Sequence, residues 1–309
     1  MNGYQPEGIF SSPDFQEETV FSLSLLEKAK EKKKILEATV LLCDQDMNLH
    51  VSLGDITGII PKEEVVFPIG TQVVKDIAIL TRVGKRVCFH VQRLEMHNGV
   101  PFAILSRKSA QKECYFNKIS TLLPGDIIKA RVTHLEPFGA FLDIGCGIVS
   151  LLPIDAISVS RISHPSARLA TGDVIDVVVS TKNDGRIYVS RKELLGTWEE
   201  NAALFSAGQT VPGIVRSIER YGIFIELTPN LTGLAELREN VFVDDCTTVY
   251  IKSILPDRMK IKLIILDCGK HSCLPPKNAF AAFYPKGNHI DYWRYSPINA
   301  VKNIETRFS

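Results

Sequence analysis

Residues 138–143 read FGAFLD, and the same pattern returns as YGIFIE at residues 221–226. The spacing is kept upstream, because Gly125 and Val132 recur as Gly208 and Val215. A whole structural unit therefore repeats, rather than one short motif.

The two rings of the first copy, Phe138 and Phe141, can be read in two ways. They can be core residues, as most phenylalanines are. They can also lie on the surface of a strand, on either side of a glycine that adds no side chain to that surface. Flat rings in such a position suit stacked bases. We favour the surface, because Val132, Leu142 and Ile144 already supply an inward-facing set.

The segment around this motif resembles a known RNA-binding domain. It runs from LPGD at 123–126 to GRIYVSRK at 185–192 and is similar to the domain repeated in bacterial ribosomal protein S1. The resemblance implies a five-stranded OB-type barrel whose RNA surface holds two aromatics, a histidine, an acid and a basic residue. It assigns the aromatics to Phe138 and Phe141 and the basic residue to Arg186.

Two positions depart from that pattern. Pro153 stands where the family has its histidine, and Lys182 stands about where the acid would be. With Arg131 also nearby, these changes raise the local positive charge. We therefore expect stacking together with phosphate contacts from Arg186, Lys182 and Arg131.

The fold class that we predict is all-β: three tandem five-stranded OB-type barrels joined by short helices, with an acidic N-terminal arm and an irregular C-terminal tail. The expected segments are an acidic arm that can be disordered (1–22), a short helix (23–34), a first barrel (35–109), a linking helix (110–122), a second barrel (123–195), a second linking helix (196–204), a reduced third barrel (205–267) and the tail (268–309).

The three barrels are expected to differ in their surfaces. The first has Met47 and His50 in place of the two rings, so it lacks a stacking platform. The third keeps Tyr221 and Phe224, with Lys260 in the place of Arg186, but acidic residues outnumber basic ones there. We expect the third barrel to bind RNA more weakly than the second.

Charge is segregated although the whole chain is nearly neutral. Residues 1–27 contain five acids and neither lysine nor arginine. This arm is either simply solvated or covers a basic surface until RNA displaces it.

Outside the ring motifs, three segments leave alternatives open. In the loop of the second barrel, Arg161, His164 and Arg168 either line the RNA path or are solvated. Trp198 is expected to pack between barrels, after a Thr197/Glu200 capping box. The tail aromatics either contact RNA or pack on the third barrel, and we favour packing; they are Tyr284, Tyr292, Trp293 and Tyr295.

Several classes of function are disfavoured. No nucleotide-binding, nucleophile-elbow or zinc-protease motif is present, so we do not expect an enzyme, and we predict no cofactor. Cys268, His271 and Cys273 have an irregular spacing for a metal site, and we predict no metal.

Seven cysteines without a Cys-x-x-Cys pair indicate a reducing compartment. No apolar run approaches the roughly 20 residues that span a bilayer, and we expect a cytoplasmic monomer without membrane contact.

The predicted function is binding of single-stranded RNA by stacking and phosphate contact. The resemblance implies messenger RNA, a role in translation and the small ribosomal subunit as a partner. The alternative is a protein-interaction scaffold whose RNA contact is incidental, which the ring-free first barrel favours.

Overall fold

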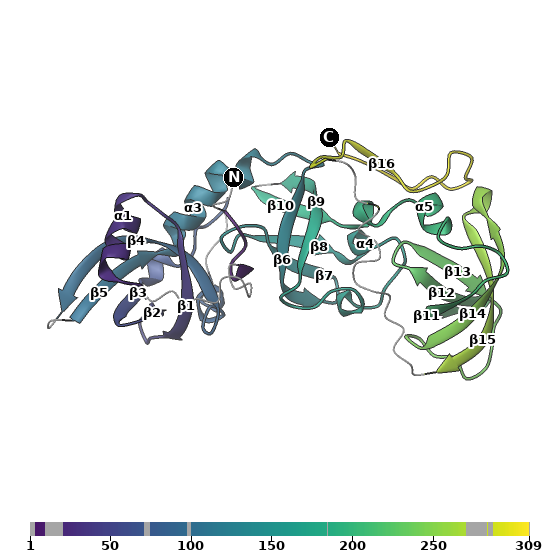
Figure 1. The fold of residues 1–309 in the computed structure, drawn as a ribbon, viewed down its shortest axis with the longest axis horizontal. Coiled ribbons are helices and arrows are strands. Elements are labelled where there is room, and N and C mark those ends of the chain that lie inside the picture. Colours follow the sequence, from purple (N-terminus) through teal and green to yellow (C-terminus); the bar gives the residue numbers. More distant parts are fainter. Residues whose placement is uncertain are drawn as a thin grey trace.

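The computed structural model describes residues 4–9, 21–70, 75–97, 100–183, 185–269, 283 and 287–308. Over these residues the chain forms three closed β-barrels arranged in a row (Figure 1). The predicted fold class of three tandem five-stranded barrels is therefore confirmed. None of the helices in the described ranges is both long and apolar enough to cross a membrane.

Each barrel uses the same strand order, in which the third and fifth strands pair in parallel. The first barrel contains β1 (Leu36–Cys43), β2 (Leu49–Leu53), β3 (Ile56–Ile60), β4 (Arg86–His97) and β5 (Val100–Ser106). The second contains β6 (Ile127–Glu136), β7 (Gly139–Asp143), β8 (Val149–Pro153), β9 (Val174–Asn183) and β10 (Arg186–Ser190). The third contains β11 (Thr210–Glu219), β12 (Gly222–Thr228), β13 (Leu231–Ala235), β14 (Cys246–Leu255) and β15 (Lys260–Gly269).

The first strand of every barrel has an irregularity at the same place. The register shifts between Val40 and Leu42 in β1, between Val132 and His134 in β6, and between Val215 and Ser217 in β11. Such a bulge bends a strand and increases its twist. It lets the first strand pair with the second at one end and with the fourth at the other, which closes the barrel.

The repeated glycine of the ring motif is required by close packing of the backbone. A Cβ atom on Gly139 would lie 2.4 Å from the carbonyl oxygen of Leu152, and one on Gly222 would lie 2.6 Å from that of Ala235. A side chain at either position would push the neighbouring strand away. The motif thus holds its two rings on a tightly paired β-hairpin.

Alternating side chains fill each barrel. In the second, Val132, Leu142 and Ile144 are buried in one core cluster, as the sequence predicted. The third barrel has a separate core that includes Trp198, which is 2 % exposed. Trp198 therefore packs, and the expected capping box of Thr197 and Glu200 is present at the start of its helix.

Short helices lie at the ends of the barrels: α1 (Leu23–Glu31), α2 (Ile77–Leu80), α3 (Arg107–Asn117), α4 (Ile154–Ile157) and α5 (Trp198–Ala202). The 3-10 turns are η3 (Lys62–Glu64), η4 (Ile119–Thr121), η5 (Pro165–Ala167), η6 (Lys192–Leu195) and η7 (Pro256–Arg258). Helix α3 begins at Arg107 rather than at residue 110, because the Ser106 hydroxyl caps it by accepting from the Ser109 amide.

Residues 4–9 pack against the first two barrels instead of being solvated. Glu7 is buried between the first two barrels, where the Arg107 guanidinium donates to both of its carboxylate oxygens at 2.7 and 2.9 Å. The Cys88 amide of β4 also donates to this carboxylate, and the Glu7 amide donates to Asp143 of β7. Of the two alternatives for the arm, simple solvation is wrong for these residues, which cover basic side chains because desolvated arginines need a carboxylate partner. Displacement of the arm by RNA stays a prediction. Residues 10–20 lie outside the described ranges.

The C-terminal segment is more ordered than the irregular tail that we expected. It contains a two-stranded sheet of β16 (Tyr292–Arg294) and β17 (Glu305–Arg307), drawn above α5 in Figure 1. Trp293 and Tyr295 are buried in the core of the third barrel, so they pack, whereas Tyr292 is 46 % exposed. Tyr284 lies outside the described residues.

Candidate nucleic-acid interface

The two ring pairs have the same geometry in the second and third barrels. Phe138 and Phe141 meet edge to face, with centroids 6.0 Å apart and planes at 87°. Tyr221 and Phe224 do likewise at 5.9 Å and 90°. The leading ring is open to solvent in both, since Phe138 is 55 % and Tyr221 is 69 % exposed. Each pair therefore offers an accessible aromatic surface outside the barrel core.

A third ring extends the pair in the second barrel. The His134 imidazole lies stacked against Phe141, with centroids 6.4 Å apart and planes 21° from parallel. Its Nε2 is 2.7 Å from Glu136 Oε1. We call His134, Phe138 and Phe141 the ring platform. The family's histidine position holds Pro153, but the bulge in β6 brings His134 opposite Phe141 and supplies an imidazole from another strand.

The next two strands continue this row. Phe141 pairs across to Leu151 of β8, and Leu151 pairs with Tyr188 of β10. Tyr188 is half-buried, and Arg186, two residues earlier on the same face, is exposed. Arg186 thus lies on the strand that continues the row of rings, and its role as the basic residue of an RNA site stays a prediction. The sequence reasoning missed Tyr188, although alternation along β10 from Arg186 could have indicated it.

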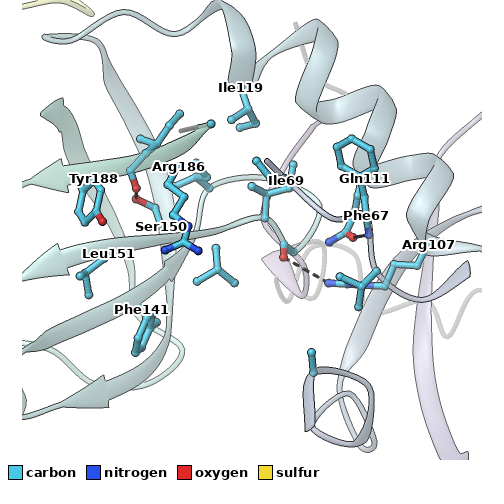
Figure 2. Close-up of a pocket in the computed structure, with 18 of the residues that line it drawn as sticks. Phe67, Ile69, Arg107, Gln111, Ile119, Phe141, Ser150, Leu151, Arg186 and Tyr188 are labelled. Atoms are coloured by element: carbon cyan, nitrogen blue, oxygen red, sulfur yellow. Dashed lines mark hydrogen bonds between the residues drawn. The ribbon is translucent and has the colours of Figure 1, made fainter. Parts of the chain in front are cut away.

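This row forms one wall of a cleft of about 370 Å³ between the first two barrels, which we call the interbarrel cleft. Figure 2 shows Phe141, Leu151, Tyr188 and Arg186 on one side and Phe67, Gln111 and Arg107 on the other. The opposite wall is fixed, because the Phe67 amide donates to Gln111 Oε1 at 2.9 Å and its ring contacts Tyr115. The first barrel therefore contributes to this surface through its loop after η3.

The other two expected cations of the second barrel are held by backbone carbonyls. Lys182 Nζ donates to the carbonyl oxygens of Ser120 and Leu122, beyond the end of α3. Arg131 donates to the carbonyl oxygen of Glu7 at 2.8 Å. Both keep their charge near the interface, but neither lies beside the rings as Arg186 does.

The three candidate RNA-binding residues in the loop of the second barrel have different environments. Arg161 is exposed, and His164 caps η5 by accepting from the Ser166 amide. The side chain of Arg168 is 8 % exposed and pairs with Glu226 of β12, which also pairs with Arg216 at 2.7 Å. Arg168 therefore joins the second and third barrels instead of being solvated, because Glu226 is a buried carboxylate that draws both guanidinium groups.

The third barrel has the same row of paired residues, with lysines at the positions of Tyr188 and Arg186. Phe224 pairs with Leu234, and Leu234 pairs with Lys262, so Lys262 occupies the position of Tyr188 and Lys260 that of Arg186. In the first barrel, His50 occupies the position of Phe141, and its Nε2 is 3.1 Å from Asp44. Of the three residues weighed as metal ligands, only Cys268 is described, and its thiol contacts Thr247.

These features describe a tandem-barrel protein with exposed aromatic pairs on two of its barrels. Residues 122–192 match the family model of the S1 RNA binding domain. The chain is 34 % identical to small ribosomal subunit protein bS1 of Leuconostoc lactis over 146 residues, covering 44 % of this chain and 33 % of that protein. It is 29 % identical to bS1 of Staphylococcus haemolyticus over 239 residues, covering 75 % of this chain and 58 % of that protein.

The chain is accordingly similar to bS1 proteins over as much as 75 % of its length, and residues 122–192 are similar to the S1 RNA binding domain. It spans between a third and three fifths of the length of these curated relatives. Among solved structures, a multidomain protein with nucleic acid binding domains from Streptococcus pneumoniae matches 76 % of this chain and 73 % of its own, at 15 % identity and a TM-score of 0.25.

Proposed function

We propose that this chain binds single-stranded RNA by stacking bases on the ring platform of the second barrel and pairing phosphates with nearby cations. The observation that carries the proposal is the row of rings from His134 through Phe141 to Phe138, which Leu151 of β8 connects to Tyr188 and Arg186 of β10. The match of residues 122–192 to an RNA-binding domain supports it.

The chemistry follows from the shapes of the groups. An exposed ring accepts the face of any base, and stacking on it contributes about 1–3 kcal/mol per base. The Arg186 guanidinium can contact a phosphate, and such a contact does not read sequence. Duplex RNA hides its base faces, so the platform should prefer single strands.

The third barrel would supply a second, weaker platform through Tyr221 and Phe224 with Lys260 and Lys262. The names of the relatives extend the proposal to the small ribosomal subunit, and the resemblance of the second barrel extends it to messenger RNA and translation. The competing function is a protein-interaction scaffold, which the first barrel favours, because His50 is hydrogen-bonded to Asp44 in place of an open ring.

Fluorescence anisotropy tests the proposal with a labelled, unstructured RNA of about 12 nucleotides and its duplex form. We expect tighter binding of the single strand, and a log–log salt slope of about −2 to −4, since each phosphate contact adds about −0.7. Equal affinity for the two forms, or a slope near zero, would favour the scaffold function.

A further inference from the structure

A second pocket between the first two barrels is lined by cations. It has a volume of about 150 Å³, and its lining includes Arg82, Lys85 and Arg86 from the first barrel and Arg131 from the second. Positive charge from both barrels thus meets in one hollow, which we call the cationic pocket. None of its first-barrel residues belongs to a ring motif.

The acids beside this pocket already have partners. The Glu7 carboxylate pairs with Arg107, and the Asp143 carboxylate accepts from the amides of Gly145, Gly147 and Glu7 at 2.7–3.0 Å. Arg82 reaches Glu7 only at 3.8 Å. Among the described residues that line the pocket are four cations (Arg82, Lys85, Arg86 and Arg131) and two carboxylates (Glu7 and Asp143). Arg86 also pairs with Glu37, and Glu7 with Arg107.

The cations therefore remain short of counter-charge. The buried Nε of Arg82 has no hydrogen-bond partner, and no ion pair or hydrogen bond of the Lys85 ammonium is found over the described ranges. Burial and the nearby Arg107 lower the pKa of Arg82, and burial and Arg82 lower that of Lys85. Like charges held together in this way favour a bound anion.

The cationic pocket adjoins the interbarrel cleft. Arg82, Gly147 and Val149 line both hollows, and Val149 begins β8, the strand that carries Leu151 of the ring row. A strand whose bases lie on the ring platform can thus pass through the cleft toward the cations.

We propose that the cationic pocket binds a phosphate group of the RNA strand whose bases stack on the ring platform, so that the first barrel contributes phosphate contacts although it has no rings. This rests on the proposed function. It assigns Arg82 and Lys85 of the first barrel, together with Arg131, to the RNA interface.

Replacing Lys85 tests this most cleanly, because the side chain is exposed and its loss leaves no carboxylate unpaired. Lys85→Gln and Arg82→Gln are compared with Lys30→Gln, which removes an exposed lysine of α1 that lines neither hollow. Anisotropy is measured with RNAs of about 4 and 12 nucleotides, the range of OB-fold site sizes. Thermal melting verifies that each variant is folded.

With the longer RNA, we expect Lys85→Gln to weaken binding several-fold and to reduce the steepness of the salt slope by about 0.7, one phosphate contact. The shorter RNA and the Lys30→Gln control should show neither change. Unchanged affinity and slope in both Lys85→Gln and folded Arg82→Gln would overturn the proposal.

Two further measurements distinguish failure of the ring platform from failure of the phosphate contact. A Phe138→Ala/Phe141→Ala variant that binds as the wild type does would refute the platform, whatever Lys85→Gln shows. Inorganic phosphate is titrated against wild type and Lys85→Gln without RNA. Binding of phosphate that depends on Lys85, with no effect of Lys85→Gln on the longer RNA, would assign the pocket to a free anion and overturn the RNA contact.

Discussion

At the scale of single residues, His289 fastens the C-terminal segment to the second barrel. Its Nδ1 is 2.7 Å from Asp126 and its Nε2 is 3.2 Å from Asp291. The hydrogen bond to Asp126 is the main cause that raises the pKa of His289 above its usual 6.5. Backbone bonds flank it, from the Ile127 amide to Asn288 and from the Ile290 amide to Gly125.

The raised pKa predicts that this attachment weakens with increasing pH. A histidine whose folded-state pKa is raised stabilises the fold fully below its unfolded-state value of about 6.5, and loses that contribution as pH rises through the folded-state value. Hydrogen exchange of the Ile127 and Ile290 amides, corrected for intrinsic rates, should show more protection at pH 6 than at pH 8. His289→Gln should remove the difference. Equal protection at both pH values in the wild type would refute the prediction.

Which site residues can be read from the sequence depends on how local their signals are. Phe138, Phe141, Tyr221 and Phe224 stand in a repeated motif, so their common surface position could be predicted. His134 could not, because the bulge that brings it against Phe141 depends on pairing between β6 and β7. The ion pair of Arg168 could not be predicted for a similar reason, since its partner Glu226 lies in the next barrel.

At the scale of elements, residues 4–9 act as a connector between the first two barrels. Glu7 contacts β4 through the Cys88 amide, α3 through Arg107 and β7 through Asp143. The sequence showed the acidic character of this segment but not its burial, because the matching arginines are far away in the chain. Only the fold brings Arg107 and Arg131 together around Glu7.

Because Glu7 is buried in this connector, we predict that Glu7→Gln greatly lowers the free energy of unfolding. Removing one charge of a buried ion pair leaves Arg107 uncompensated, which costs about 3–5 kcal/mol. Urea unfolding measures the change, and Glu27→Gln on the exposed side of α1 is the control, expected to stay within about 0.5 kcal/mol of the wild type. An unchanged unfolding midpoint for Glu7→Gln would show that this segment does not tie the barrels together.

At the scale of the whole molecule, the three barrels are joined by polar contacts as well as by helices. Between the second and third, the Val159 amide donates to Asn230 Oδ1, while Asn230 Nδ2 donates to the carbonyls of Lys192 and Gly196. The barrel repeat was predictable because apolar alternation and the glycine positions recur. The interfaces between barrels were not, since they depend on contacts between distant loops.

RNA binding on the ring platform is tested by the affinity of the Phe138→Ala/Phe141→Ala variant for an unstructured RNA of about 12 nucleotides. Phe242→Ala is the control, because it removes an equally exposed ring from the third barrel outside both ring pairs. We predict that the double variant loses about 1–3 kcal/mol for each base that no longer stacks, with melting behaviour retained, and that Phe242→Ala binds as the wild type does. A folded double variant with unchanged affinity would contradict RNA binding on the ring platform.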